Sequence, residues 1–182
     1  MRAWVRTINL LAIIAALGHP CEQRAQAAPS PSEPRVNPDH TLAIVVNRSN
    51  PIDNLAFSEL RKIFLGERNH WSNGHRIVIA MLDYGQPERR AVLRLIYRMD
   101  EANYQDFLLR GMFRGDVFVA PKTLASPMIL RKFVFNAPGA IGYLRLRNVD
   151  PSVKVVRIDG LSPQDKGYRL QIDESLAIQG SE

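Results

Sequence analysis

The stretch TLAIVVN, residues 41–47, is the clearest strand signal in the sequence. It is apolar and partly β-branched, and the turn-forming residues RSNP at 48–51 end it. A run of this length and composition is typical of a strand buried on both faces of a sheet. We therefore predict a central strand here, with the rest of a domain built around it.

Strand and helix patterns alternate along the rest of the chain. Short apolar runs predict strands at residues 76–82, 140–144 and 153–158, with a candidate last strand at 168–172. Between them, apolar residues spaced three and four apart predict helices. These apolar positions are Leu60, Ile63 and Phe64; Val92, Leu93 and Ile96; Tyr104, Phe107 and Leu108; and Ile129, Leu130, Phe133 and Val134. The alternation indicates an α/β domain with a mostly parallel or mixed sheet flanked by helices.

Capping residues mark the helix starts. Ser58, Asp100 and Ser126 are the predicted N-caps, because their side chains can accept a hydrogen bond from a free backbone N–H. Proline is expected at the first helical position at 87 and at 127. The helix over 87–97 is predicted to be an amphipathic surface helix whose arginines lie mostly away from its apolar side. Those arginines are Arg89, Arg90, Arg94 and, just beyond the helix, Arg98.

Residues 1–27 have the pattern of an export signal. Arg2 and Arg6 precede the apolar run INLLAIIAAL, and AQA at 25–27 supplies the small residues of a cleavage site. The run is about half as long as a bilayer span of ~20 residues, so we expect a cleaved signal peptide and a periplasmic protein rather than a membrane anchor. Lipidation at Cys21 is the lesser alternative.

The remaining sequence predicts one domain. Residues 28–40 contain four prolines and few apolar side chains, which predicts a Pro-rich linker. The domain is expected over residues 41–173, followed by a C-terminal tail at 174–182. Cys21 is the only cysteine of the chain, so a mature protein without its leader has no thiol for disulfides or metal ligation.

Composition and motifs exclude several functions. The chain carries a formal charge of +6, but export argues against a nucleic-acid partner. Its arginines are therefore expected on solvated helix faces, with a weak attraction for anions as the alternative. There is no Gly-rich phosphate loop and no nucleophile elbow, and His70 and His75 fit a polar loop better than a metal site. We predict neither enzymatic activity nor a metal or cofactor.

Four separated motifs together resemble a known family. They are LRKIFLG at 60–66, Trp71 with Gly74 before a strand, PGAIGY at 138–143, and VKVVRIDGLSPQDKGYRL at 153–170. In this order they look like the phosphate-binding subunits of ABC transporters, which are type 2 periplasmic binding proteins. The resemblance implies a periplasmic-binding-protein-like fold that binds a small anionic solute without catalysis and delivers it to a membrane permease. The short chain resembles a short branch of this superfamily, with one lobe or a reduced clamshell.

The sequence departs from this family where phosphate would bind. In the transporter subunits, the strand before the 87–97 helix ends in an arginine and a Ser-Gly-Thr turn that hold phosphate. This chain has Leu82 at the arginine position and Gln86-Pro87-Glu88 at the turn. Leucine lacks the cationic donor, proline lacks a backbone N–H, and Glu88 adds negative charge, so high-affinity phosphate capture is not expected. Arg89 could restore a positive charge for another anion.

The candidate ligand-binding residues are polar residues at predicted strand ends and helix starts, where open α/β sheets bind ligands. They are Asn47, Ser49, Tyr84, Gln86, Arg89 and Ser126. The alternative for the turn at 84–89 is a solvent-exposed loop without a ligand. A second hypothesis for the whole chain is a ligand-independent periplasmic interaction module for a membrane sensor or channel partner.

Overall fold

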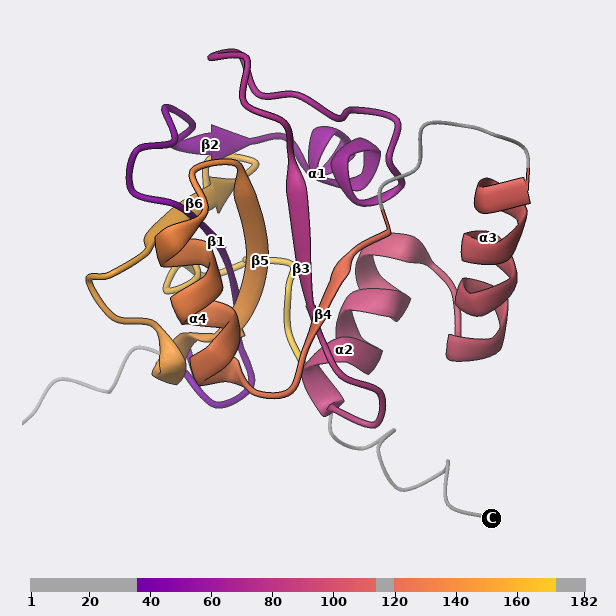
Figure 1. Cartoon of the computed structure of the whole chain (residues 1–182). Helices are drawn as coiled ribbons and strands as arrows, with labels where there is room; N and C mark the ends of the chain where they lie inside the picture. Colours follow the sequence, from indigo (N-terminus) through magenta and orange to yellow (C-terminus); the bar gives the residue numbers. More distant parts are fainter. Residues whose placement is uncertain (1–35, 114–119, 173–182) are drawn as a thin grey trace, which may run out of the picture. The chain divides into compact units, whose positions relative to one another are not determined.

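The computed structural model describes residues 36–113 and 120–172. The predicted signal peptide, residues 28–35 of the linker and the tail at 174–182 lie outside the described residues, and the predicted domain boundaries stay predictions. Six described strands form one sheet in the order β2-β6-β1-β5-β3-β4 (Figure 1). They are β1 (Leu42–Val46), β2 (Asn54–Leu55), β3 (Val78–Leu82), β4 (Lys122–Leu124), β5 (Ala140–Arg145) and β6 (Lys154–Ile158).

The sheet is mixed, with one strand reversed. β1 is antiparallel to both of its neighbours, β5 and β6, whereas the β2–β6, β3–β5 and β3–β4 pairs are parallel. The predicted central strand is confirmed, since every residue of β1 is buried. Because β1 runs opposite to the other strands, its carboxyl end lies at the end of the sheet where the other strands begin.

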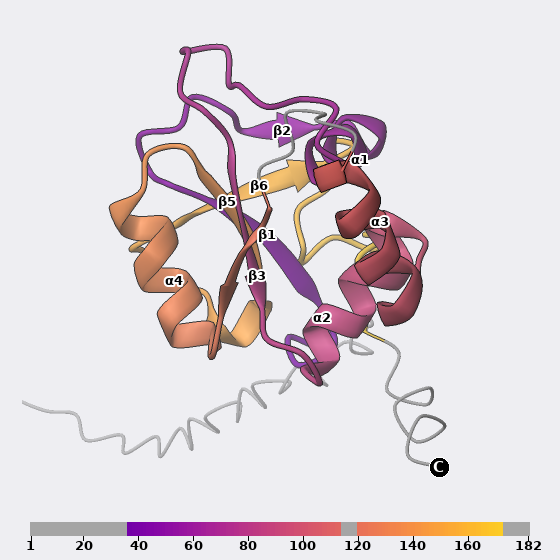
Figure 2. The same cartoon turned by 45° about the vertical axis from the view of Figure 1, so that its right-hand side comes forward.

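Helices cover both faces of the sheet. Figure 2 shows α4 on one side and α1, α2 and α3 on the other, so the predicted α/β class is confirmed. The helices are α1 (Phe57–Phe64), α2 (Pro87–Val92), α3 (Glu101–Phe113) and α4 (Pro127–Asn136), with a π turn η1 (Leu93–Tyr97) and a 3₁₀ turn η2 (Leu146–Asn148). All six strands share one sheet, so the described residues form a single lobe.

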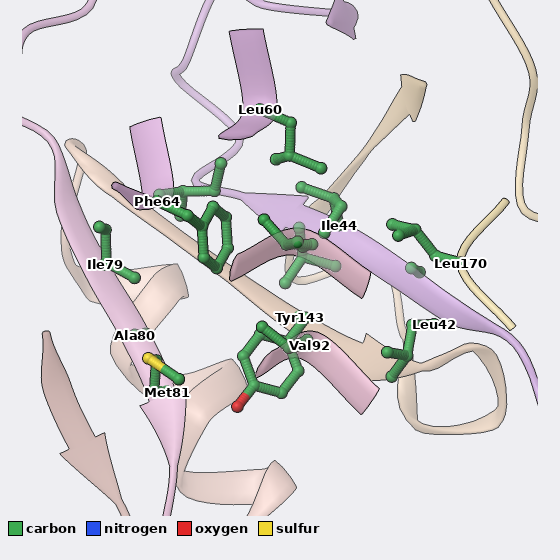
Figure 3. Close-up of a cluster of buried hydrophobic side chains, with 14 of the residues drawn as sticks. Leu42, Ile44, Leu60, Phe64, Ile79, Ala80, Met81, Val92, Tyr143 and Leu170 are labelled. Carbon is green, nitrogen blue, oxygen red and sulfur yellow. The ribbon is translucent and has the colours of Figure 1, made fainter. Parts of the chain in front are cut away.

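The core lies between the sheet and the α1–α2 layer. In the close-up of Figure 3, Phe64 from α1 and Val92 from α2 point toward Ile44 of β1 and Tyr143 of β5. All four side chains are fully buried. The apolar stripes predicted for these helices are confirmed, because Leu60, Ile63, Phe64, Val92, Leu93 and Ile96 are buried. Burial of one helical stripe against the sheet is the main source of stability in such a layer.

Two helix details differ from the sequence prediction. The N-cap of α1 is Ala56 rather than Ser58, and the first free N–H, that of Phe57, donates to Oδ1 of Asp159 at 2.9 Å. A cap supplied by a residue so distant in sequence leaves no local signal. Ile129 of α4 is 42% exposed, because Leu130 and Val134 occupy the narrow face that meets the sheet.

The predicted helix over 87–97 is also not a single α-helix. α2 ends at Val92 and continues as the π turn η1, which ends at Arg98 in a left-handed backbone conformation with φ 59°. The prediction of a strand at 168–172 is wrong. In this segment only Gln171 forms an isolated β-bridge, with Thr41. The short strands β2 and β4 were not predicted, because two or three residues are too few to show an alternating pattern.

Candidate functional site

Two loops meet at the end of the sheet formed by the carboxyl ends of β3 and β4. We call this end of the sheet the β3–β4 edge. Leu82 of β3 pairs with Leu124 of β4, and the Asp83 N–H donates to the Leu124 carbonyl at 3.0 Å. The loops that follow, at 83–86 and 125–126, therefore leave the sheet side by side, at the lower end of the view in Figure 1. Each loop leads into a helix, α2 from the first and α4 from the second.

Polar side chains of these two loops are exposed or half-buried at this edge. Tyr84 is 77% exposed, and the left-handed backbone of Gly85, with φ 84°, turns the chain toward Gln86. Gln86 is the N-cap of α2, yet its side chain makes no capping hydrogen bond. Ser126 caps α4 by accepting from the Ile129 N–H at 3.3 Å, which confirms the cap predicted there. The phenol of Tyr84 and the amide of Gln86 are available to donate hydrogen bonds to a solute.

Arg89 lies behind these loops and is buried rather than solvated. Its Nε and Nη2 donate to the two carboxylate oxygens of Glu101, at 3.0 and 2.7 Å, and its Nη1 donates to the Leu82 carbonyl at 3.0 Å. The guanidinium also stacks over the ring of Tyr104, 5.2 Å from its centroid. The prediction that Arg89 lies off the buried side of its helix is therefore wrong, because the start of α3 supplies a carboxylate that compensates for burial.

Electrostatics in this pair favour the charged forms. Burial opposes the charge of Arg89, but the hydrogen bonds and charge of Glu101 outweigh it and raise the pKa of the guanidinium. Burial likewise opposes ionisation of Glu101, and hydrogen bonds from Arg89 and Gln105 with the charge of Arg89 still lower the pKa of that carboxyl group. Glu101 thus fills the bidentate position that an external carboxylate or phosphate would take on an arginine.

Glu88 is neutralised in a second buried pair. Its Oε1 accepts from Nε of Arg145 at the end of β5, at 2.5 Å, and both side chains are only 7% exposed. Arg145 also donates to the Asp39 carbonyl at 2.6 Å. The expected negative charge of Glu88 near the loops is therefore balanced within the fold. Behind both pairs, the Leu82 N–H donates to Oη of Tyr143, and burial raises the pKa of that phenol.

Asn47 and Ser49 lie at the opposite edge of the sheet, since β1 is antiparallel to its neighbours. The Asn47 amide donates to the carbonyls of Val134 and Phe135, at 2.9 and 2.6 Å, and its oxygen accepts from the N–H and hydroxyl of Ser49. These bonds tie the end of β1 to the end of α4. The structure thus brings Tyr84, Gln86 and Ser126 to one edge, with Arg89 buried behind them, and leaves Asn47 and Ser49 elsewhere.

A cleft of about 580 Å³ lies between the α2–η1 segment and the start of α3. Arg90, Arg94 and Arg98 line it, and Nη1 of Arg90 donates to the Gly85 carbonyl at 3.0 Å. The arginines are evident in the sequence, but the cleft could not be predicted from it, because residues of α3 form the opposite wall. Their spacing of four residues was the available signal.

The fold and the edge loops define the class: a single lobe of the periplasmic-binding-protein-like α/β type. Comparison with curated proteins finds the phosphate-binding protein PstS of Bacillus subtilis strain 168, 26% identical over 134 residues, which cover 70% of this chain and 41% of PstS. The recognised resemblance to the substrate-binding proteins of phosphate ABC transporters is thus confirmed. No protein-family model matches the chain.

Solved structures agree on the fold. An ABC-type phosphate transport receptor from Vibrio cholerae superposes with a TM-score of 0.56 at 23% identity, covering 68% of this chain and 48% of the receptor. PstS from Borrelia burgdorferi gives a TM-score of 0.56 at 13% identity, covering 74% of this chain and 55% of that protein. The chain therefore spans about half the length of these relatives. No helix in the described part of the chain is long and apolar enough to cross a membrane.

Proposed function

We propose that this chain is an exported, non-catalytic binding domain that takes a small anionic solute at the edge formed by the loops at 83–86 and 125–126. The observation that carries the proposal is the meeting of these loops where β3 and β4 end, with Tyr84, Gln86 and Ser126 around the junction. Open α/β sheets bind ligands at the carboxyl ends of their strands. Sequence similarity to a phosphate-binding protein supports an anion as the solute.

The proposed solute is not tightly bound phosphate. Leu82 offers no cationic side chain at the end of β3, and Arg89 already holds the carboxylate of Glu101. An incoming dianion at this edge would be held by neutral donors, chiefly Gln86 and Tyr84. Neutral hydrogen bonds are roughly half as strong as charge-assisted ones, so the affinity for phosphate should be weak. A role for Arg89 in binding would require release of Glu101 and stays a prediction, as does a role for Asn47 and Ser49.

The proposal includes a periplasmic location after signal cleavage and a membrane permease or sensor as partner. Its support is the signal pattern of residues 1–27 and the similarity to transporter receptors. The alternative, a ligand-independent interaction module, is not favoured, because the relatives are named for binding or transporting phosphate. Fractionation of expressing cells would test the location: the protein should leave with the periplasmic contents, and retention in the cytoplasm would contradict export.

A thermal-shift screen tests the binding edge. Wild-type protein is melted at low salt with phosphate, sulfate, other inorganic oxyanions and small monocarboxylates. At 100 times its dissociation constant, a bound anion adds about 2.7 kcal/mol to stability, which a melting curve resolves. The Gln86→Ala and Ser126→Gly variants should lose that shift, while Arg157→Gln, an exposed arginine on β6, should keep it. A shift that both edge variants retain would place the anion elsewhere.

A further inference from the structure

The cleft between the α2–η1 segment and α3 carries an unbalanced positive charge. Arg90, Arg94 and Arg98 line one wall, and the acidic residues of the cleft are Asp100 and Glu101. Glu101 is neutralised by Arg89, so Asp100 alone opposes three arginines. Within residues 36–113 and 120–172, the guanidinium groups of Arg94 and Arg98 have no hydrogen-bond or ion-pair partner.

Arg90, Arg94 and Arg98 form a row in the sequence at a spacing of four residues, and all three line the same cleft. Residues four apart drift around an ordinary α-helix, which has 3.6 residues per turn. Here Arg90 lies on α2, Arg94 on the π turn η1 and Arg98 at its left-handed end, so the three arginines follow a change in backbone winding rather than one regular helix. Arg98 itself has φ 59° and ψ 42°, a conformation that residues other than glycine and asparagine rarely adopt. π turns and left-handed non-glycine residues recur at functional sites.

This row is costly without a ligand. Like charges four residues apart on a helix repel each other, and here no acidic residue lies between them on the helix. An anion in the cleft would remove that repulsion and provide partners for two free guanidinium groups. The cleft volume, about 580 Å³, lies within the range of small-molecule sites.

We propose that this cleft is a second anion site, distinct from the β3–β4 edge, for a small organic molecule that carries two or more carboxylate or phosphate groups. Arg90 and Arg98 are eight residues apart, about two helical turns, so separated acid groups match the row better than one compact oxyanion does. Leu93 and Met99 also line the cleft and offer contacts to a carbon skeleton. Bidentate contacts to arginine fit both kinds of acid group.

Calorimetric titration of the purified protein at low salt tests this site, with citrate and fructose 1,6-bisphosphate as probes and orthophosphate as the compact anion. At least one organic probe should bind saturably and more tightly than orthophosphate. Arg94→Gln and Arg98→Asn should each weaken that binding roughly tenfold, as expected for loss of one charge-assisted contact. Asparagine is chosen at 98 because it tolerates the left-handed backbone.

Two matched variants separate binding in the cleft from binding at the β3–β4 edge and from attraction by overall charge. Arg157→Gln removes one exposed positive charge from β6 and should leave citrate binding unchanged, whereas Gln86→Ala changes the β3–β4 edge and should also leave it unchanged. Absence of saturable binding of both organic probes to folded wild-type protein would overturn the proposal. So would an equal loss of affinity in Arg157→Gln and Arg94→Gln, since that result indicates attraction by overall charge alone.

Discussion

The carboxylate of Glu101 binds Arg89 in the two-point geometry with which arginine holds external carboxylates and phosphates. The chain therefore satisfies its buried arginine internally, and positive charge remains available on the row of Arg94 and Arg98 instead. The sequence indicates Arg89 as a candidate residue but does not predict its partner, because Glu101 belongs to the next helix. A local helical pattern assigns a side to each residue and does not reveal which neighbouring element compensates a buried charge.

Removing the carboxylate of Glu101 should destabilise the fold. Glu101→Gln leaves the Arg89 guanidinium buried without its counter-charge. We expect the free energy of unfolding to fall by about 3 kcal/mol. This is the low end of the usual cost of breaking a buried pair, because the Glu101 side chain is 21% exposed. Urea denaturation measures the change. Glu59→Gln is the control, since Glu59 pairs with Lys62 at the surface and its loss should cost much less. Equal losses in the two variants would contradict a special role for the buried pair.

The same pair predicts a pH dependence. The pKa of Glu101 is lower in the folded state than its ordinary value of 4.5, so the unfolded chain takes up a proton first as the pH falls. The stability that the pair contributes is present in full above about pH 5 and is lost as the pH falls through 4.5 and below. In urea titrations from pH 7 to pH 3, the gap between wild type and Glu101→Gln should shrink. A gap that stays constant would mean that ionisation of Glu101 contributes nothing.

At the scale of elements, the sequence predicted those whose signals are local. The apolar run of β1, the Ser126 cap and the stripe of α1 all follow from residues next to one another. The α1 cap comes from Asp159 at the end of the neighbouring strand β6, and β4 exists because β3 pairs with it. The change from α2 to a π turn had no pattern of its own. Tertiary contacts decide these features, so a local pattern does not contain them.

Helix α4 depends on a glycine in β5 for its close approach to the sheet. A Cβ on Gly142 would lie 2.9 Å from Cδ2 of Leu130 and 3.3 Å from Cβ of Ala80. Gly142→Ala should therefore lower the free energy of unfolding by about 1–3 kcal/mol. In a Leu130→Ala background the same substitution should cost less, because the nearest clashing atom is gone. Urea denaturation of the four proteins of this cycle gives the coupling, and an equal cost in both backgrounds would contradict the packing argument.

At the scale of the described lobe, the direction of β1 decides which candidate residues meet. All six were predicted at strand ends or helix starts, and periodicity cannot say whether a neighbouring strand runs parallel or antiparallel. Because β1 is reversed, Asn47 and Ser49 end up at one edge and Tyr84, Gln86 and Ser126 at the other. The class of fold was predicted from the resemblance of four separated motifs to a known family. The part of the chain that matches PstS covers 41% of the length of that protein.

Our main proposal is that this lobe binds an anion at the β3–β4 edge without an arginine at the end of β3, where the chain has Leu82. Isothermal titration calorimetry on the wild-type protein, with orthophosphate, sulfate and small monocarboxylates compared at low salt, is the decisive test. We expect saturable binding of one of these anions, lost in Gln86→Ala and kept in Arg94→Gln, with orthophosphate no tighter than about 1 μM, or −8.2 kcal/mol. Nanomolar binding of orthophosphate, or no binding of any anion to the folded protein, would contradict it.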